Sequence, residues 1–547
     1  LDTFVFLKEQ ISTGYFEKLI QAYLLDNQHG ALVTIVPEPG RTARLDEELK
    51  AKLQAYKESL SREEIDKLVA DTKHLQEYQE EPSSQEDLEK IPMLTREDIS
   101  REIAPIYNEE MKIAEIPTVF HEIETNGIGY LDLMFDLSDV PEKDLPMVGL
   151  LQAVLGIIDT EHYEYGELFN EINRHTGGIG TSLELYPDVT KVREKEFKAT
   201  FEIKAKALYG QIPFAIRMMK EILTASKLDD EKRLKEILSM TKTRLQDRFL
   251  SAGHSAAALR AMSYKSPISK FKDTTNGIGY YQNIREMEEH FEDKKEEITN
   301  SLKALSELIF RKGNMMISYT ATKEGLAVLE EEIGSLKEAL YPERTPESRC
   351  VLHCEKKNEG FKTSSKVQFA AKAGNFIDAG EEYNGALQIL KVIMSYEYLW
   401  INIRVKGGAY GCMSNFNRIG EGYFVSYRDP NLGRTLEIYD GVPEYLENFT
   451  VSERDMTKYI IGTISNIDQP MTPATKGDRS MNLYMNHVSA EMIRKEREQI
   501  LTANQEDIRA LAGVARAVLA NDQICVIGNE AKIEEEKELF MTVENLF

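Results

Sequence analysis

The sequence predicts an α+β fold: two homologous domains, each an antiparallel sheet covered by helices, preceded by a helical hairpin linker. Three observations support this prediction. After residue 116, segments with the two-residue alternation of strands are mixed with helical segments. A charged stretch from 42 to 113 has the apolar spacing of helices. A short motif built on two glycines occurs near 174 and again near 404, each time between a helical segment and a strand-like one.

Residues 1–41 are predicted to be the carboxyl-terminal tail of a preceding domain. The stretch "GALVTIVPEPG" (30–40) is rich in β-branched residues and ends in Pro and Gly, which predicts a strand. Its sheet partners are expected upstream of this chain. The chain also begins at Leu1 in the middle of a pattern, so we expect a piece of a longer protein.

Residues 42–115 are predicted to form the helical hairpin linker. Leu49, Leu53, Tyr56 and Leu60 recur at helical spacing and make one apolar stripe. Ser61 and Glu64 then have the spacing of a capping box at the start of a second helix. Two long antiparallel helices with polar outer faces are typical of a linker.

The third domain is predicted at 116–342 and the fourth at 343–547. In the third we expect two strands around the turn "TNG" (125–127), a strand at 196–208 and a closing strand at 314–322. Helices are expected at 146–158, 211–250 and 283–312. In the fourth we expect strands at 364–374, 422–429 and 523–529, a helix at 384–403 and two helices around 449–455.

The repeated motif has the form R-x-x-G-G. A spacing of 230 residues separates Arg174 from Arg404, and the following glycines match at the same spacing, Gly177 with Gly407 and Gly178 with Gly408. Because both copies lie between a helix and a strand, the four glycines are predicted to form a structural turn. Lys406 and Tyr410 of the second copy stand where the first has Thr176 and Gly180.

Composition excludes several classes of function. The net charge of −25 argues against sequence-independent nucleic-acid binding, which needs Lys and Arg to neutralise phosphates. The longest apolar stretch, 148–158, is too short to cross a bilayer, and no secretory signal opens the chain. Four cysteines are too few for a disulfide scaffold. We therefore expect a protein of the cytoplasm or an organelle matrix, with neither nucleic acid nor membrane as a partner.

"NIRVKGGAYG" (402–411) is the strongest candidate for chemistry. It is not a phosphate-binding loop, because Lys406 precedes the glycines instead of following them. If a strand begins near Gly408, Tyr410 lies two residues into it and Arg404 at the end of the preceding helix. Both side chains then face one cavity, where Arg404 would bind a carboxylate or carbonyl and Tyr410 would donate to a developing oxyanion. The alternative is that the whole motif is a structural turn.

No metal site is predicted. "RCVLHC" (349–354) alternates like a strand, which would put Cys350 and Cys354 on one face and His353 on the other. His74 and Glu77 lie on a charged helix, and Tyr78 stands where a second histidine ligand would be needed. The chain shows no complete catalytic set.

The chain resembles the carboxyl-terminal half of the pitrilysin/insulinase superfamily of zinc metallopeptidases, in its presequence-protease branch. The resemblance covers nearly the whole chain. It rests on four stretches in order: "EEPSSQEDLEKIPMLTREDI" (80–99), "TNGIGYLDLMFDLSDVPEKDLPMVGLL" (125–151), "LFNEINRHTGGIGTS" (168–182) and "RVKGGAYG" (404–411).

The resemblance implies one half of a clam-shell that encloses a chamber for unfolded peptides. In that family the amino-terminal half binds zinc through H-x-x-E-H, a motif this sequence lacks, and a Glu acts as general base for attack by a zinc-bound water. The carboxyl-terminal half supplies an Arg and a Tyr at the substrate, which by motif are Arg404 and Tyr410.

The resemblance therefore implies that this chain is inactive alone, binds no zinc itself and needs a missing amino-terminal half as partner. Two alternatives stay open. The chain could be the non-catalytic subunit of a heterodimeric peptidase, or a module that binds peptides without cleaving them.

Overall fold

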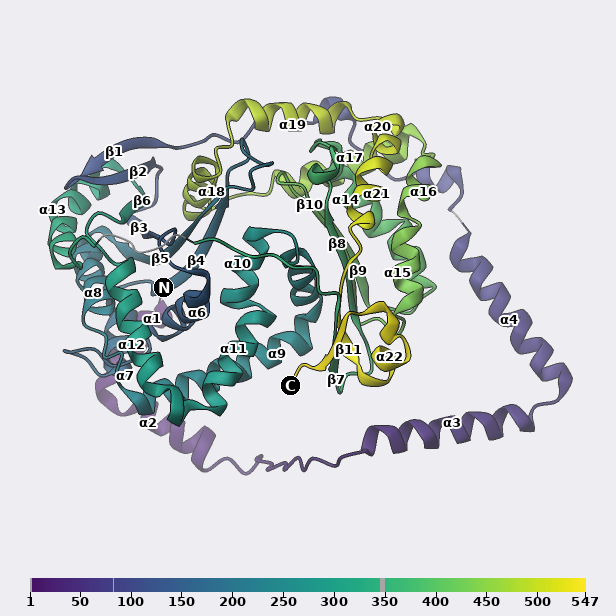
Figure 1. The fold of residues 1–547 in the computed structure, drawn as a ribbon, viewed down its shortest axis with the longest axis horizontal. Helices are drawn as coiled ribbons and strands as arrows, with labels where there is room; N and C mark the ends of the chain where they lie inside the picture. The colour runs from purple at the N-terminus through teal and green to yellow at the C-terminus, as the bar shows by residue number, and fades with distance from the viewer. Residues whose placement is uncertain (1, 82, 345–349) are drawn as a thin grey trace. The chain divides into compact units, whose positions relative to one another are not determined.

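The computed structural model describes residues 2–81, 83–344 and 350–547, which form two units. The first unit ends at Met93 and the second extends from Leu94 to Phe547 (Figure 1). No helix of the described residues is both long and apolar enough to span a membrane.

The first unit is helical throughout its regular structure. Its α-helices are α1 (Asp2–Gln10), α2 (Tyr15–Ile20), α3 (Arg41–Ser59), α4 (Arg62–Glu80) and α5 (Gln85–Glu89). The predicted capping box is confirmed at the start of α4: Ser61 Oγ accepts from the Glu64 amide (3.2 Å) and Glu64 Oε2 from the Ser61 amide (2.8 Å). The apolar stripes of α3 and α4 stay about half exposed, so the two helices do not bury them against each other as the predicted antiparallel pair would.

The strand predicted at 30–40 is wrong for this structure. These residues form no regular secondary structure before the turn at Pro39 and Gly40, and Leu32 is 96% exposed. A strand must pair its backbone N–H and C=O groups with a neighbour, and no described residue pairs with this segment.

The second unit contains two six-stranded sheets. The first sheet has the order β1-β2-β6-β3-β5-β4 and the second β12-β7-β11-β8-β10-β9. The strands of the first are β1 (Glu109–Ile113), β2 (Ile116–Glu122), β3 (Ile128–Asp136), β4 (Ile179–Pro187), β5 (Phe197–Leu208) and β6 (Met315–Ala321). Those of the second are β7 (Glu359–Thr363), β8 (Phe369–Asn375), β9 (Gly411–Phe416), β10 (Glu421–Tyr427), β11 (Gln523–Asn529) and β12 (Thr542–Asn545).

Helices surround both sheets (Figure 1). Those between β3 and the end of the first repeat are α6 (Leu145–Val154), α7 (Tyr165–His175), α8 (Ile212–Thr224), α9 (Glu231–Ser263), α10 (Pro267–Asn276), α11 (Ile278–Glu289), α12 (Phe291–Ile309) and α13 (Lys323–Ala339). The second repeat has α14 (Ala386–Tyr396), the π-helix η7 (Trp400–Val405), α15 (Gly433–Asp440), α16 (Val442–Glu447), α17 (Glu453–Ile467), α18 (Pro473–Met485), α19 (Ala490–Thr502), α20 (Gln505–Ala510), α21 (Ala512–Ala520) and α22 (Glu530–Glu535).

The two sheets are copies of one topology. In both, the first two strands of the order β2-β6-β3-β5-β4 and its counterpart β7-β11-β8-β10-β9 are parallel, and every later pair is antiparallel. The α+β class and the duplication predicted from R-x-x-G-G are therefore confirmed. The sheets are mixed rather than purely antiparallel, because β2–β6 and β7–β11 run parallel.

Several predicted elements are corrected. The strands around "TNG" do not form a hairpin, because β6 lies between β2 and β3. The helix predicted at 384–403 ends at Tyr396 and resumes as η7. The predicted helical character of 42–113 fails at its end, since residues 109–113 form β1. The domain limits remain predictions; the structure's own division falls at Met93, inside the predicted linker.

Helix α9 covers the face of the second sheet that the second repeat's own core leaves open (Figure 1). Phe369, Ala371 and Val425 of that face lie in one apolar core with the alanines of α9, whereas alternate strand residues such as Ala370 and Phe424 lie in the other core. The approach is close, because a Cβ on residue 253 of α9, a glycine, would overlap the ring of the facing phenylalanine. Small residues on α9 are therefore required for this packing.

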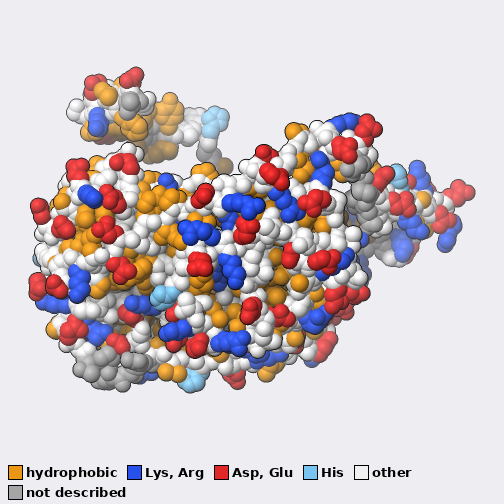
Figure 2. Space-filling model, turned by 90° about the horizontal axis from the view of Figure 1, so that it is seen from above, with side chains coloured by type: hydrophobic (Ala, Val, Ile, Leu, Met, Phe, Trp, Pro, Cys, Tyr) orange, Lys and Arg blue, Asp and Glu red, His pale blue; other side chains and the backbone are white. Residues whose placement is uncertain are grey.

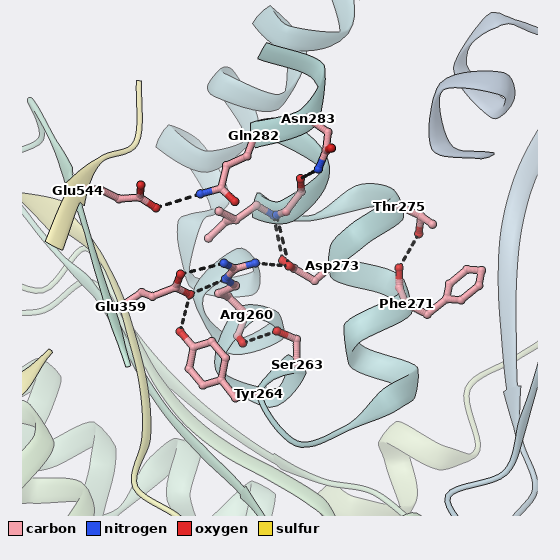
Figure 3. A network of polar contacts seen from close by, with 12 residues as sticks. Arg260, Ser263, Tyr264, Phe271, Asp273, Thr275, Gln282, Asn283, Glu359 and Glu544 are labelled. Atoms are coloured by element: carbon pink, nitrogen blue, oxygen red, sulfur yellow. Dashed lines mark hydrogen bonds and ion pairs between the residues drawn. The ribbon is translucent and has the colours of Figure 1, made fainter. Parts of the chain in front are cut away.

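A buried ion network joins α9 to β7 (Figure 3). Arg260 donates from Nε and Nη2 to Glu359 (2.6 and 2.8 Å) and from Nη1 to Asp273 (2.6 Å). All three side chains are at most 6% exposed. Burial acts to raise the pKa of Glu359, but the hydrogen bonds and charge of Arg260 outweigh it and hold the pKa below its ordinary value.

Helix α18 covers the corresponding face of the first sheet. Met481 and Met485 of α18 pack with Val119, Met134 and Tyr186. At residue 477 of α18, also a glycine, a Cβ would overlap the threonine hydroxyl that faces it from β6. Each repeat thus provides the helix that covers the open sheet face of the other.

We expect Arg260→Met to lower the free energy of unfolding by ~3–5 kcal/mol, because it leaves Glu359 and Asp273 buried without a partner charge. Arg516→Met is the control: its ion pair with Glu447 has side chains 57% and 52% exposed, so the loss should stay below ~1 kcal/mol. Denaturant unfolding followed by circular dichroism measures both. Equal losses for the two variants would contradict the assigned role of the network.

His121 of β2 predicts how stability depends on pH. Its ring is fully buried between the Tyr107 carbonyl and Ser318 Oγ. Burial lowers the His121 pKa, against the opposing effect of the Tyr107 hydrogen bond. As pH falls below ~6.5 the unfolded state takes up a proton that the folded state refuses, so stability decreases. Between pH 7.5 and 5.5, wild type should lose up to ~1.4 kcal/mol more than His121→Asn in urea unfolding. Parallel profiles for the two proteins would contradict this.

Candidate functional site

The predicted site residues lie where η7 leads into the edge strand β9. Arg404 is in the last turn of η7, and Tyr410 precedes β9 by one residue. The strand therefore starts at Gly411, not near Gly408 as predicted. The Tyr410 amide donates to the carbonyls of Tyr427 (3.0 Å) and Arg428 (3.3 Å), which attaches Tyr410 to the end of β10.

The glycine pairs allow this turn in both repeats. Gly408 and Gly178 have φ of +81° and +117°, a region in which residues with a Cβ are strained. A Cβ on Gly407 would overlap the Ile403 carbonyl oxygen, and one on Gly177 would crowd the side chain of Lys206. The turn therefore favours glycine at these positions, and in both repeats it leads into the equivalent edge strand, β4 or β9.

Arg404 and Tyr410 lie beside one another. The Arg404 guanidinium is 4.3 Å from the Trp400 ring centroid and 5.3 Å from that of Tyr410, and Nη1 donates to the Tyr410 carbonyl. No carboxylate of the described residues is within ion-pair distance of Arg404. Its charge is therefore free to act on a ligand while its position is fixed by two aromatic rings.

The Tyr410 hydroxyl faces solvent. The side chain is 63% exposed, and its ring makes an edge contact with Tyr427, with centroids 5.6 Å apart. No hydrogen bond to its hydroxyl is formed within the described part of the chain. A phenol held by its ring and open at its oxygen can donate a hydrogen bond to a ligand.

The first repeat shows what the turn does without these features. Arg174 donates to Glu171 (2.7 Å), so its charge is paired, and Gly180 occupies the position of Tyr410. The contrast separates the structural part of the motif, which is the glycines, from the part specific to the second repeat.

Tyr427 and His254 support the site, and the sequence did not identify either. The Tyr427 hydroxyl donates to the Ser251 carbonyl of α9 (3.1 Å), next to a break in the helix at Ala252. The His254 ring packs edge-on against Tyr427, with centroids 4.9 Å apart, and burial lowers the His254 pKa. The strand alternation of β10 could place Tyr427 on a face, but no local pattern shows that α9 covers that face.

The described residues do not fit a zinc ion. No group of three or more His, Cys, Asp or Glu side chains among them has the arrangement of a metal site. The predicted strand at 350–354 is wrong, because this segment has no regular structure, and His353 Nδ1 lies 2.8 Å from Glu142. Burial raises the pKa of the Cys350 thiol to about 11, which disfavours the thiolate that binds metal.

On the face shown in Figure 2, acidic and basic side chains are interspersed. Such a surface is ordinary for a chain with 92 acidic and 67 basic residues.

Two family profiles match this chain. One, which describes the region associated with subfamily C of the M16 peptidases, matches residues 35–287, and the other, "PreP C-terminal domain", matches residues 358–530. Among curated proteins, Protein HypA of Clostridium perfringens is 40% identical over 540 residues, covering 99% of this chain and 55% of that protein. Presequence protease 1, chloroplastic/mitochondrial, of Arabidopsis thaliana is 28% identical over 541 residues, covering 96% of this chain and 49% of that protein.

Solved structures show the same fold. A peptidase M16 inactive domain from Pseudomonas fluorescens aligns with a TM-score of 0.52 at 14% identity, covering 78% of this chain and 98% of that one. A conserved protein from Enterococcus faecalis aligns with a TM-score of 0.53 at 12% identity, covering 77% and 99%.

The fold and the first profile define the class, a chain of the M16, or pitrilysin, peptidase family. More narrowly, the chain belongs to the carboxyl-terminal half of the presequence-protease branch of that family. It spans about half the length of the curated relatives it matches.

The turn can be tested by substitution. Gly408→Ala should lower the free energy of unfolding by ~1–2 kcal/mol, because alanine is strained at this φ. Gly462→Ala is the control: it lies within helix α17, its Cβ would be 3.6 Å from Val392, and it should stabilise by ~0.5–1 kcal/mol. The fluorescence of Trp400, the single tryptophan, follows unfolding close to the turn. A neutral Gly408→Ala would contradict the required left-handed conformation.

Proposed function

We propose that this chain is the half of a zinc metalloendopeptidase that binds no metal, and that the whole protein degrades unfolded peptides. The observation that carries the proposal is the pairing of Arg404, which has no carboxylate partner among the described residues, with the exposed Tyr410 phenol. The first repeat has neither feature at its equivalent turn. The names of the presequence-protease relatives support a peptidase.

In this proposal, Arg404 and Tyr410 bind the peptide at the carbonyl that reacts. The guanidinium would donate to a substrate carbonyl or carboxylate, and the phenol would donate to the oxygen on which negative charge develops. Trp400 and Tyr427 would hold the two groups in place before substrate arrives, so little ordering is needed on binding.

The metal of this proposal is zinc, which would supply the Lewis acid that activates water. Because the described residues offer no set of ligands, zinc would be bound by the missing amino-terminal half. The two halves would enclose a chamber, and such a chamber would admit unfolded peptides and exclude folded proteins.

The alternatives are a non-catalytic subunit of a heterodimeric peptidase and a peptide-binding module. A heterodimer would regain activity with a separately encoded partner. A binding module would keep its affinity for peptides without a partner and never cleave them.

Mixing this chain with a separately produced amino-terminal half should give cleavage of an unstructured fluorogenic peptide, and this chain alone should give none. Tyr410→Phe should lower kcat/KM by ~10²-fold or more, as expected for loss of an oxyanion donor, and Arg404→Ala by a similar factor. Tyr396→Phe, a change at another exposed tyrosine of the same repeat, is the control and should retain full activity. Wild-type activity in both site variants, or turnover by this chain alone, would overturn the proposal.

A further inference from the structure

A cavity of about 710 Å³ lies beside the candidate site. Helices α9 and α10 of the first repeat form one wall, and β9 and β10 of the second repeat form the other. It begins next to the proposed substrate-binding group: the Tyr410 ring contacts Tyr427, Tyr427 contacts His254, and His254 lines the cavity. The volume is within the range of ligand sites in proteins.

The polar side chains of this cavity carry an excess of positive charge. Arg248 of α9 and Lys272 of α10 both line it. Arg248 donates only to neutral acceptors, the side-chain and backbone carbonyls of Asn276. Within the described residues, neither cation has a carboxylate at ion-pair distance; Lys272 acts on Glu184 only from farther away.

One carboxylate lines the cavity, and it is already engaged. Glu421 accepts from Ser269 Oγ (2.6 Å) and from Asn417 Nδ2 (2.8 Å). His254 Nδ1, by contrast, is buried and has no hydrogen-bond partner in the described part of the chain. A ligand that brings a carboxylate would therefore meet two cations and a free ring nitrogen, without a competing acid.

The remaining wall is apolar and comes from both repeats. Leu259, Met262 and Ile268 face it from the helices, and Met413 and Val425 from the strands. Met413 belongs to β9, whose outer edge is unpaired in the sheet and can therefore accept an extended chain. The edge also leads directly from Tyr410 to the cavity wall.

We propose that this cavity binds the carboxyl-terminal end of an extended peptide, with its terminal carboxylate at Arg248 and Lys272 and its apolar side chains against the α9–β9 wall. The inference rests on the proposed function only in taking a peptide as the ligand. Hydrolysis of a peptide bond creates a carboxylate of this kind, so the cavity also suits the amino-terminal product of cleavage.

The test uses the 547-residue chain without any partner half. A fluorescein-labelled, apolar hexapeptide is titrated as the free acid and as the carboxyl-terminal amide, and binding is followed by anisotropy. The acid should bind at least about fivefold more tightly than the amide. Arg248→Gln should reduce this preference to less than about twofold. Because Arg248 also bonds to Asn276, the exposed Lys272→Met provides a second variant with the same expected result.

Two further variants complete the design. Lys270→Met removes a charge from the same helix at a position that does not line the cavity, and should leave the preference unchanged. Ser255→Trp, at the exposed rim, should weaken acid and amide alike by filling the entrance. Equal binding of acid and amide, or a preference that survives Arg248→Gln and Lys272→Met, would overturn the inference. So would wild-type binding in Ser255→Trp.

The result is separable from that of the cleavage assay. If Arg404→Ala and Tyr410→Phe cleave normally while the acid preference holds, the proposed function fails and the cavity stands. If the preference is absent while both variants lose activity, the cavity is wrong and the proposed function stands.

Discussion

The guanidinium of Arg260, enclosed by Glu359 and Asp273, is the constraint on which the second unit depends (Figure 3). Burying an unpaired charge is prohibitive, so α9 must lie where all three groups meet. Asp273 also accepts the amide of Ile278 at the start of α11, which fixes the turn from α10 to α11. One ion network thereby sets the position of α9, the path of the helices that follow it and the closure of the second sheet.

The candidate site depends on that position of α9. Arg404 and Tyr410 are local neighbours in the chain, but Tyr427, which holds the Tyr410 ring, is itself bonded to Ser251 of α9. The cavity beside the site is likewise enclosed by α9 and α10 on one side and by β9 and β10 on the other. Geometry at an edge of the second sheet is therefore determined by a helix from the first repeat.

Sequence reasoning succeeded where the signal is local. The alternation in 196–208 and 523–529 located β5 and β11 to within a residue, and the Ser61 capping box was found by spacing alone. It failed where a partner comes from far along the chain. The insertion of β6 between β2 and β3 leaves no trace near "TNG", and β-branched residues at 30–40 cannot pair with a strand that the described residues do not contain. Arg404 and Tyr410 were found together because they share one turn, whereas His254 joins them only through α9.

The exchange of covering helices has a consequence for how such a chain can be divided. Helices α9 and α18 come from the same stretch of each repeat, between β5 and β6 and between β10 and β11. Each repeat thus behaves toward the other like a subunit of a twofold dimer, in which the same element is given and received. A single copy would leave an apolar sheet face in water and would be an aggregation hazard. The sequence repeat and the unit of stability are therefore different objects, and cutting the chain between the repeats divides one cooperative core.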